Sequence, residues 1–567
     1  MLETPVPSAP QFGPVQAAEA GGSMPPAVKL PARAHLAALA GAGVGALSRV
    51  TGRGGGSVVG GHVILALEPK ALARFSAGRR VVLVSGTNGK TTTTKLLARA
   101  LSSAGGEEVI TNATGANLST GLAATLASGR PGATAVLEVD EAWLGLVAGE
   151  VEPAAIVLLN LRRDQLDRNN EVRQVAERWR RACGALRPGS VVVANADDPL
   201  VVWAAAVAAD VRWVGAGLTW TSDACGCPRC GGEVHFGGGP QPASKEQARR
   251  RAAPGGWRCA SCGFARPDPV IWLADDDLTG RDRDAGHVDQ VNLDRIDLPG
   301  ANLPGANLPD TNLPGANLPD ADIRELGAAW AGHAGYAVEA SGVVHEVALR
   351  LPGRCNQANA VVVLAAATSL GYGASGVLSA MAEVEEVAGR YATVRSGGTT
   401  ARLLLAKNPA GWAEVFTMLT PPPGPVVVAI NARTADGQDP SWLWDVPFER
   451  LRGRPVVATG ERYLDLAVRL HYAEVEHACD PGLLSAIAAS GPGRADVVAN
   501  YTAFHQVLAA TRSTGDDRAR RGPREAGPRE AGPREAGPRE AGPREAGPRE
   551  VADREADRGG AGKGGLL

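Results

Sequence analysis

Short apolar runs alternate with helical patterns between residues 80 and 214. The runs consist largely of valine, leucine, isoleucine and alanine, so each strand would be buried on both faces, which is typical of a parallel sheet covered by helices. Ligands of such sheets bind at the carboxyl ends of the strands. The predicted strands are Val81–Val84, Ala135–Val139, Ala155–Leu159 and Val191–Ala194, and the predicted helices include Thr91–Ser103 and Val172–Ala185.

A second alternation of strands and helices begins at Ala401. Its length of about 120 residues is typical of one domain. We therefore expect a first α/β domain over residues 30–390 and a C-terminal α/β domain over residues 391–513. The second set of predicted strands is Arg402–Leu405, Val426–Ile430, Pro455–Ala458 and Val497–Ala499, and an apolar helix is predicted at Val361–Leu370.

Three stretches lack this alternation. Residues 1–29 are rich in proline, alanine and glycine, and residues 514–567 contain a Gly-Pro-Arg-Glu-Ala repeat, so we expect both to be disordered. Residues 292–323 repeat with a period of five. This run is short for a repeat solenoid, and its prolines remove ladder donors, so we expect an inserted loop without catalytic residues.

The apolar segment His35–Leu47 precedes the first strand. A membrane span needs about 20 apolar residues, so we predict no transmembrane segment. The segment has the length of a signal-peptide core, but we favour an amphipathic or docking helix of a cytoplasmic protein. The formal net charge of −2 gives no bulk attraction to nucleic acid or to an anionic membrane.

The stretch Val81–Thr94 reads VVLVSGTNGKTTTT, a strand followed by a glycine turn and a helix start. Such a turn exposes backbone N–H groups to an anion, while the lysine faces the β- and γ-phosphates and a threonine hydroxyl faces Mg²⁺. Val84 stands where the standard phosphate loop has glycine. We predict an ATP site whose residues here are Gly86, Thr87, Asn88, Gly89, Lys90, Thr91 and Thr92.

Polar residues end the other predicted strands. They are Glu138 to Glu141, Asn160, and the Asn195-Ala-Asp-Asp-Pro segment. Carboxylate and amide oxygens beside a triphosphate suit Mg²⁺, which it shares with phosphates. One such cluster alone is more often a solvated loop, but three on one sheet edge favour a nucleotide site.

Two C-x-x-C pairs, Cys227/Cys230 and Cys259/Cys262, have 28 residues between them. Four thiolates suit a closed, structural Zn²⁺ site. We predict a zinc ribbon inserted at about residues 222–268, and we leave Cys225 outside it. The alternative is a pair of redox-active or idle motifs.

The phosphate loop, Glu138, the NADDP segment and LPGRCNQANA (Leu351–Ala360) together resemble the ATP-binding central domain of the Mur ligases. The resemblance implies that Glu138 binds Mg²⁺ and that Asn356 and Asn359, with Asn195, lie near the adenosine. Gln165 stands where these ligases have a histidine, and the modified lysine of several ligases is absent, so a second metal site is not carried over.

The motifs AKNPAGW, ADGQDPSWLWD and ANYTAF, joined to a four-cysteine insertion, resemble the MurT family. These are the synthetase subunits of lipid II isoglutaminyl synthases. The resemblance implies ATP-dependent amidation of the D-glutamate α-carboxyl of lipid II through an acyl phosphate. It also implies ATP, Mg²⁺ and Zn²⁺ as cofactors, a GatD-type glutaminase partner in a heterodimer, and a cytoplasmic enzyme at the inner membrane face.

No residue set in the chain suggests a glutaminase nucleophile, because Cys183 and Cys355 lack a suitable setting. The resemblance places a third-member acid in the DGQDPSW loop, and we choose Asp439 over Asp436 and Asp445. The alternative for Asp439 is a turn or capping role. The rival functions are an amino-acid-adding Mur ligase, a folylpolyglutamate-type ligase, and a nucleotide-gated scaffold without turnover.

Overall fold

The computed structural model describes residues 30–51, 56–112, 116–163, 172–217, 220–237, 256–274, 335–384, 390–396 and 398–520. It divides the chain into two compact units, Met1–Thr514 and Gly515–Leu567. The predicted insertion at 292–323, the two predicted disordered ends and Gln165 lie outside the described residues, apart from the first residues of the tail.

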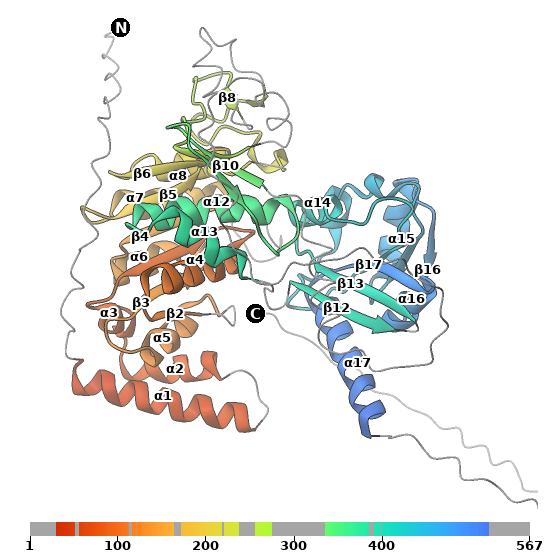
Figure 1. Ribbon diagram of the computed structural model, residues 1–567, viewed down its shortest axis with the longest axis horizontal. Coiled ribbons are helices and arrows are strands. Elements are labelled where there is room, and N and C mark those ends of the chain that lie inside the picture. Colours follow the sequence, from red (N-terminus) through yellow and green to blue (C-terminus); the bar gives the residue numbers. More distant parts are fainter. Residues whose placement is uncertain are drawn as a thin grey trace, which may run out of the picture. The chain divides into compact units, whose positions relative to one another are not determined.

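The larger sheet has nine strands in the order β11-β10-β9-β6-β5-β4-β1-β3-β2 (Figure 1). All neighbouring pairs are parallel except those that β10 makes with β9 and β11. The strands are β1 (Val81–Ser85), β2 (Val109–Thr111), β3 (Thr134–Glu138), β4 (Ala155–Leu158), β5 (Val191–Asn195), β6 (Val211–Gly215), β9 (Ile271–Leu273), β10 (Gly335–Glu339) and β11 (Val344–Val347).

Helices cover both faces of this sheet, as predicted. Alternate residues of β1 enter different cores: Val82 and Val84 pack with α4, α12 and α13, whereas Val81 and Leu83 pack with the remaining helices. The helices are α1 (Ala32–Val50), α2 (Ser57–Leu67), α3 (Ala71–Ser76), α4 (Lys90–Gly105), α5 (Ser119–Ser128), α6 (Leu144–Val151), α7 (Val172–Gly184), α8 (Pro199–Ala205), α12 (Arg354–Ser369) and α13 (Ala374–Ala382).

The four cysteines belong to a small two-stranded element beyond β6. It contains the 3₁₀ turn η1 (Ser222–Ala224) and the antiparallel strands β7 (Val234–Phe236) and β8 (Trp257–Cys259). Trp257 anchors it to the larger sheet, because Nε1 donates to the Ala196 carbonyl at 3.0 Å.

The second sheet has six strands in the order β12-β13-β17-β14-β15-β16, and only β12 is antiparallel to its neighbour. Its strands are β12 (Tyr391–Ser396), β13 (Thr399–Leu405), β14 (Val426–Ala429), β15 (Val456–Thr459), β16 (His477–Cys479) and β17 (Gly493–Ala499). Its helical segments are α14 (Pro409–Thr417), η3 (Ser441–Asp445), η4 (Phe448–Leu451), α15 (Tyr463–Tyr472), α16 (Leu483–Ala489) and α17 (Tyr501–Arg520).

Two predicted elements begin at least four residues too late. Helix α12 begins at Arg354 instead of Val361, because its polar first turns carry no apolar periodicity. Strand β17 begins at Gly493 instead of Val497, since its buried Asp496 is paired with Arg402 of β13 at 2.7 Å. In both cases tertiary contacts stabilise polar residues that an apolar pattern cannot include.

Candidate active site

The phosphate loop joins β1 to α4. It is held in place by Asn160, which lies two residues after the end of β4. The backbone N–H of Asn88 donates to Asn160 Oδ1 at 2.9 Å, and Asn160 Nδ2 donates to the Asn88 carbonyl at 3.0 Å. Gly89 has a φ of +88°, and a Cβ there would lie 2.7 Å from Oδ1 of Asn359. Only glycine allows both this conformation and this approach, so the loop and α12 meet closely.

Lys90 begins α4 and is buried. Its Nζ donates to the Gly86 carbonyl at 2.6 Å and to Glu141 Oε2 at 3.0 Å. The Glu141 carbonyl accepts from Trp179 Nε1 at 2.8 Å. The sequence indicated Glu141 only as one of three carboxylates at a strand end, whereas the structure brings it to the loop lysine. A phosphate would compete with it for the same ammonium group.

Glu138 is the last residue of β3 and pairs in register with Val84 of β1, which places it beside the start of the phosphate loop. Its backbone N–H donates to Asn112 Oδ1 at 2.8 Å, and its carboxylate accepts from Asn117 Nδ2 at 3.3 Å. The side chain is 4% exposed. A buried carboxylate oxygen at this position fits the hard oxygen ligands that Mg²⁺ requires.

A cavity of about 320 Å³ lies against the loop and combines amides with cations. The predicted nucleotide residues that line it are Asn88, Gly89, Thr92, Asn195, Asn356 and Asn359, and its cationic residues are Arg162, Arg354, Arg390 and Lys407. The remaining predicted residues (Gly86, Thr87, Lys90, Thr91 and Glu138) are not in this lining, and Thr87 lines a neighbouring cavity of about 480 Å³ with Glu141. The cationic wall suits a polyanion.

Sequence reasoning missed Arg390, which precedes β12. Its Nη2 donates to the Thr91 hydroxyl at 3.4 Å, across a chain separation of 299 residues. A lone arginine between two elements carries no periodic or motif signal, so only the fold could bring it to the phosphate loop.

Two of the asparagines predicted to bind the nucleotide also form hydrogen bonds with other groups of the protein. Asn356 Nδ2 donates to the Pro352 carbonyl at 2.6 Å and to the Tyr391 hydroxyl at 3.2 Å. Asn195 Oδ1 accepts from the backbone N–H of Asp197 at 3.0 Å. Both residues line the cavity while stabilising the backbone that shapes it.

The aspartates of the NADDP segment are engaged within the protein. Asp198 accepts from the Leu200 N–H at 3.0 Å, capping α8, and pairs with Arg162 at 2.7 Å. Asp197 pairs with Arg266 at 2.5 Å, and burial raises the pKa of Asp197 to about 6 against the opposing effect of that arginine. These carboxylates therefore hold the sheet edge together.

The phosphate loop also contacts the second sheet. Asn88 Nδ2 donates to Asn408 Oδ1 at 3.2 Å, and Asn408 Nδ2 donates to Asn88 Oδ1 at 3.3 Å. Asn408 is the N-cap of α14, where its side chain accepts from the Gly411 N–H. A reciprocal amide pair thus joins the loop to the first turn of α14.

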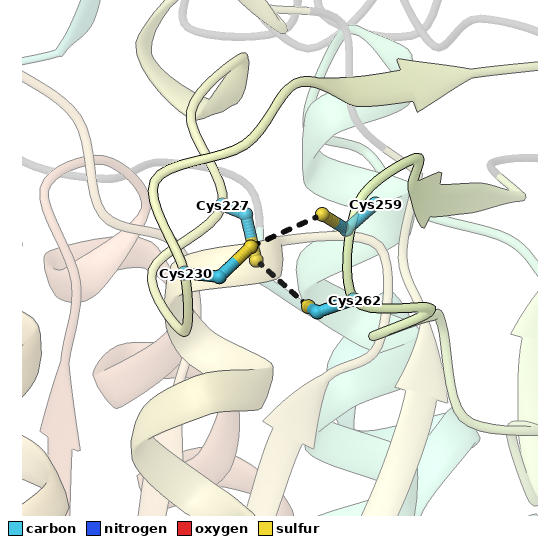
Figure 2. Close-up of side chains that lie close together, drawn as sticks. All are labelled: Cys227, Cys230, Cys259 and Cys262. Carbon is cyan, nitrogen blue, oxygen red and sulfur yellow. Dashed lines mark hydrogen bonds between the residues drawn. The ribbon is translucent and has the colours of Figure 1, made fainter.

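Figure 2 shows the four predicted metal-binding cysteines converging from two knuckles. The Sγ atoms of Cys227 and Cys262 lie 3.7 Å apart, those of Cys230 and Cys259 lie 3.5 Å apart, and all four lie within 4.8 Å of one another. A tetrahedral site with Zn–S bonds of about 2.3 Å would need sulfur separations of about 3.8 Å. The quartet therefore has the geometry to hold a metal ion, and Cys225 is outside it.

The thiols considered as nucleophiles lie in unsuitable surroundings. Burial raises the pKa of Cys183 to about 12, and it raises the pKa of Cys355 well above its usual range. The thiolate, not the thiol, is the nucleophile. Neither residue is therefore activated for glutamine hydrolysis.

The three aspartates of the DGQDPSW segment differ in their contacts. Asp436 is buried and accepts from the Thr502 N–H at 2.8 Å. Asp445 pairs with Arg163 at 3.4 Å. Asp439 is exposed, and its Oδ1 accepts from the Ser441 N–H at 2.8 Å, which is the turn contact considered as its alternative role. Asp439 and Asp445 are therefore both exposed, whereas Asp436 is not.

Comparison with known proteins identifies two family domains. Residues 84–219 match the Mur ligase middle domain, and residues 405–504 match the MurT ligase C-terminal domain. Residues 289–325 match eight copies of the pentapeptide repeat. The chain is 27% identical to a lipid II isoglutaminyl synthase (glutamine-hydrolyzing) subunit MurT of Streptococcus pneumoniae, covering 74% of this chain and 82% of the relative.

The chain resembles MurT subunits over most of its length. A second MurT subunit, from Staphylococcus aureus, is 24% identical, with 70% of this chain and 78% of the relative covered. The resemblance predicted from the motifs is therefore confirmed, and with it the class of ATP-dependent ligase.

Solved structures support the fold of this MurT-like chain. A pseudomurein peptide ligase type C from Methanothermus fervidus is 17% identical, with a TM-score of 0.50 and coverage of 77% of this chain and 79% of that one. MurF from Acinetobacter baumannii is 12% identical, with the same TM-score and coverage of 79% of each chain. Among the helices described, none has the length and apolar character that a membrane span requires.

Proposed function

We propose that the chain amidates the D-glutamate α-carboxyl of the lipid II stem peptide to D-isoglutamine, using ATP and ammonia. The observation that carries the proposal is the cavity in which the phosphate loop meets the amides of α12 and a cationic wall. The substrate is inferred from the MurT subunits of lipid II isoglutaminyl synthases, which the chain resembles.

The proposed reaction has two steps. A carboxylate oxygen of the substrate attacks the γ-phosphorus of ATP, the bond to the β-phosphate oxygen breaks, and ADP leaves. The nitrogen of ammonia then attacks the acyl carbon, the C–O bond to phosphate breaks, and phosphate leaves as the nitrogen loses a proton. Ammonia is small, so this chemistry needs no large pocket for an incoming amino acid.

Individual residues have defined roles in this proposal. Lys90 would leave Glu141 for the β- and γ-phosphates, and Arg390, which reaches Thr91 from the second sheet, would add positive charge near the transferring group. Mg²⁺, when bound, would neutralise charge on that group, and Glu138 and Thr91 are the residues that would hold it. The loop N–H groups and the amides of Asn356 and Asn359 would bind the rest of the nucleotide.

We further propose that ammonia comes from a GatD-type glutaminase in a heterodimer. Asp439 would orient and stabilise the partner's catalytic histidine as the third member of a triad. Close to it in sequence, Trp444 is 55% exposed and packs edge-to-face against Tyr472, which is 69% exposed, with ring centroids 5.4 Å apart. Exposed aromatic side chains of this kind are common anchors at protein interfaces.

For the cysteine quartet we propose a structural Zn²⁺ ion. Four thiolates leave no open position for a catalytic water, and the knuckles pack on β5 through Trp257, so the ion would stabilise the fold. We also propose domain limits at residues 390 and 513 and peripheral association of the enzyme with the inner membrane face.

The decisive test measures ATP consumption and product mass with lipid II as acceptor. We expect turnover with ammonium, and with glutamine once the glutaminase is present. Turnover that requires a free amino acid would instead favour an amino-acid-adding Mur ligase or a folylpolyglutamate-type ligase. Nucleotide binding without turnover under all conditions would favour a scaffold.

A further inference from the structure

Helix α1 packs its small residues inward and turns its large apolar residues outward. The buried positions are Ala34, Ala37, Gly41, Gly45 and Ser48, which recur every three or four residues and form one stripe. In a helix that only supports a core, the large apolar residues would occupy the buried stripe. Here the exposed positions are Leu36, Leu39, Val44, Leu47 and Val50.

The inward packing is fixed by close contact with α2. A Cβ on Gly41 would lie 2.8 Å from the Gly60 carbonyl oxygen, and one on Gly60 would lie 2.6 Å from the Gly41 carbonyl oxygen. The two helices lie side by side (Figure 1), and α2 packs in turn against α5. Because the glycine face cannot accept larger residues, α1 cannot rotate to bury its leucines.

The outward face is strongly apolar. Leu36 is 63% exposed, Leu39 72% and Leu47 63%, and the neighbouring helix adds the exposed Val58 and Val59. Several large aliphatic side chains on one helix pair form more than the scattered exposure that is normal for a protein surface. Such a surface indicates an apolar partner.

The segment that forms α1 and α2 contains basic residues and no acidic ones. Between Leu30 and Leu67 the chain has no aspartate or glutamate, whereas it has Arg33, Arg49 and Arg53 and two histidines. Arg33 lies in the first turn of α1, where its Nε donates to the Leu67 carbonyl at 2.5 Å, and Arg49 is an exposed residue of the last turn. Apolar residues bordered by arginine are typical of helices that lie in the interface of an anionic bilayer.

We propose that the outer face of α1 and α2 docks the enzyme on an anionic lipid bilayer, with the leucines in the headgroup region and the arginines on lipid phosphates. This inference rests on the proposed function, because a lipid-linked acceptor is held at a bilayer surface. A helix of 19 residues interrupted by three glycines lies on the membrane and does not cross it.

The test uses the full chain and extruded vesicles, with sedimentation as the readout. We expect binding to vesicles of phosphatidylcholine mixed with phosphatidylglycerol, weak binding to phosphatidylcholine alone, and release by salt, which screens the arginines. Each of Leu36→Gln, Leu39→Gln and Leu47→Gln should weaken binding roughly tenfold, because a buried leucine side chain contributes strongly to transfer from water. Arg49→Glu should weaken binding to the anionic vesicles only.

The matched control is Leu464→Gln with Val468→Gln on α15, because these residues are 62% and 51% exposed and also lie on a helix surface. This control should bind vesicles like the wild type. A wild type that stays in the supernatant with anionic vesicles overturns the proposal, as does an equal loss in the control. Leucine variants that abolish a dimer but keep vesicle binding would assign the face to a second copy instead.

The proposed function is tested separately with detergent-solubilised lipid II. The leucine variants should amidate it at the wild-type rate, because the altered residues lie outside the site. Vesicle binding without amidation would reject the function and leave the docking face intact. Amidation in detergent without vesicle binding would reject the docking face alone.

Discussion

At the scale of single residues, the main feature of the site is that Glu141 and an incoming phosphate would compete for the ammonium group of Lys90. The ammonium of Lys90 is held by two loop carbonyls and by Glu141. In the proposed site the Glu141 carboxylate would give way to an entering phosphate, so the lysine would already be in position before the nucleotide binds. A preorganised cation of this kind stabilises developing charge without reorganisation during the reaction.

Lys90→Ala should therefore lower kcat for amidation by about 100- to 1,000-fold, the loss that follows removal of one preorganised charge-stabilising group. The matched control is Lys95→Ala, an exposed lysine on the same helix, which should keep its activity. Steady-state amidation measures the effect, and a melting curve checks the fold. Retained turnover in the Lys90 variant would remove the nucleotide assignment.

Glu138→Ala should also lower amidation strongly, because it removes the buried oxygen ligand proposed for Mg²⁺. Titration of the metal dependence distinguishes this role from a purely structural one. We expect the variant to need far more Mg²⁺ than the wild type for the same residual rate. An unchanged Mg²⁺ dependence would place the metal elsewhere.

Asp439→Asn preserves size but removes the charge that would orient a partner histidine. In the purified complex, glutamine-dependent amidation should fall by up to about four orders of magnitude, while amidation from added ammonium should survive. Asp445→Asn, which alters an exposed aspartate of the same segment, is the control. Equal losses with both nitrogen sources would assign Asp439 to the synthetase site or to the fold.

At the scale of elements, the cysteine knuckles and the larger sheet are joined by few but well-buried contacts. Cys227, Val234 and Trp257 pack with Val202 of α8, and Arg266 pairs with Asp197 after β5. The knuckles also form part of the wall of the 480 Å³ cavity beside the phosphate loop. Loss of the metal should therefore disturb the sheet edge as well as the knuckles themselves.

Cys230→Ser should lower bound zinc and thermal stability together, because the free energy of binding a structural metal is also folding free energy. Each kcal/mol lost should lower the Tm by about 2–4 °C. Cys225→Ser, a nearby exposed thiol outside the quartet, should change neither quantity. Metal analysis and calorimetry on the same samples provide the measurement, and full zinc content in the Cys230 variant would mean that another residue completes the site.

At the scale of the whole molecule, the phosphate loop is linked to the second sheet by the reciprocal amides of Asn88 and Asn408. Arg390 makes a second link through Thr91. Both links end on the loop that would bind the nucleotide, so the position of the second sheet and occupancy of the site should depend on each other.

Asn408→Asp tests this link while keeping an oxygen to cap α14. The carboxylate can still accept from Asn88 but cannot donate to it, so one hydrogen bond is lost. Since a net hydrogen bond contributes about 1 kcal/mol, kcat/KM for ATP should fall roughly fivefold with little change in Tm. An unchanged kcat/KM would show that the amide pair has no part in nucleotide use.

The local chemistry was predictable from sequence because it depends on neighbouring residues. Apolar runs indicated the buried strands, Gly86 to Thr92 indicated the phosphate loop, and the C-x-x-C spacing indicated the thiol quartet that the structure brings within 4.8 Å. In each case a short segment carries both the conformation and the functional groups.

Only the tertiary structure decided which distant groups meet. Glu141 reaches Lys90 because β3 lies beside β1 in the larger sheet, although β2 comes between them in the chain. Arg390 reaches Thr91 from the residue before β12, a strand of the second sheet. Helix α1 illustrates the same limit: its apolar residues are compatible with burial of either face. The close approach of Gly41 to Gly60 selects the small face, and the leucines are left outside because packing, not hydrophobicity alone, determines which side of a helix is buried.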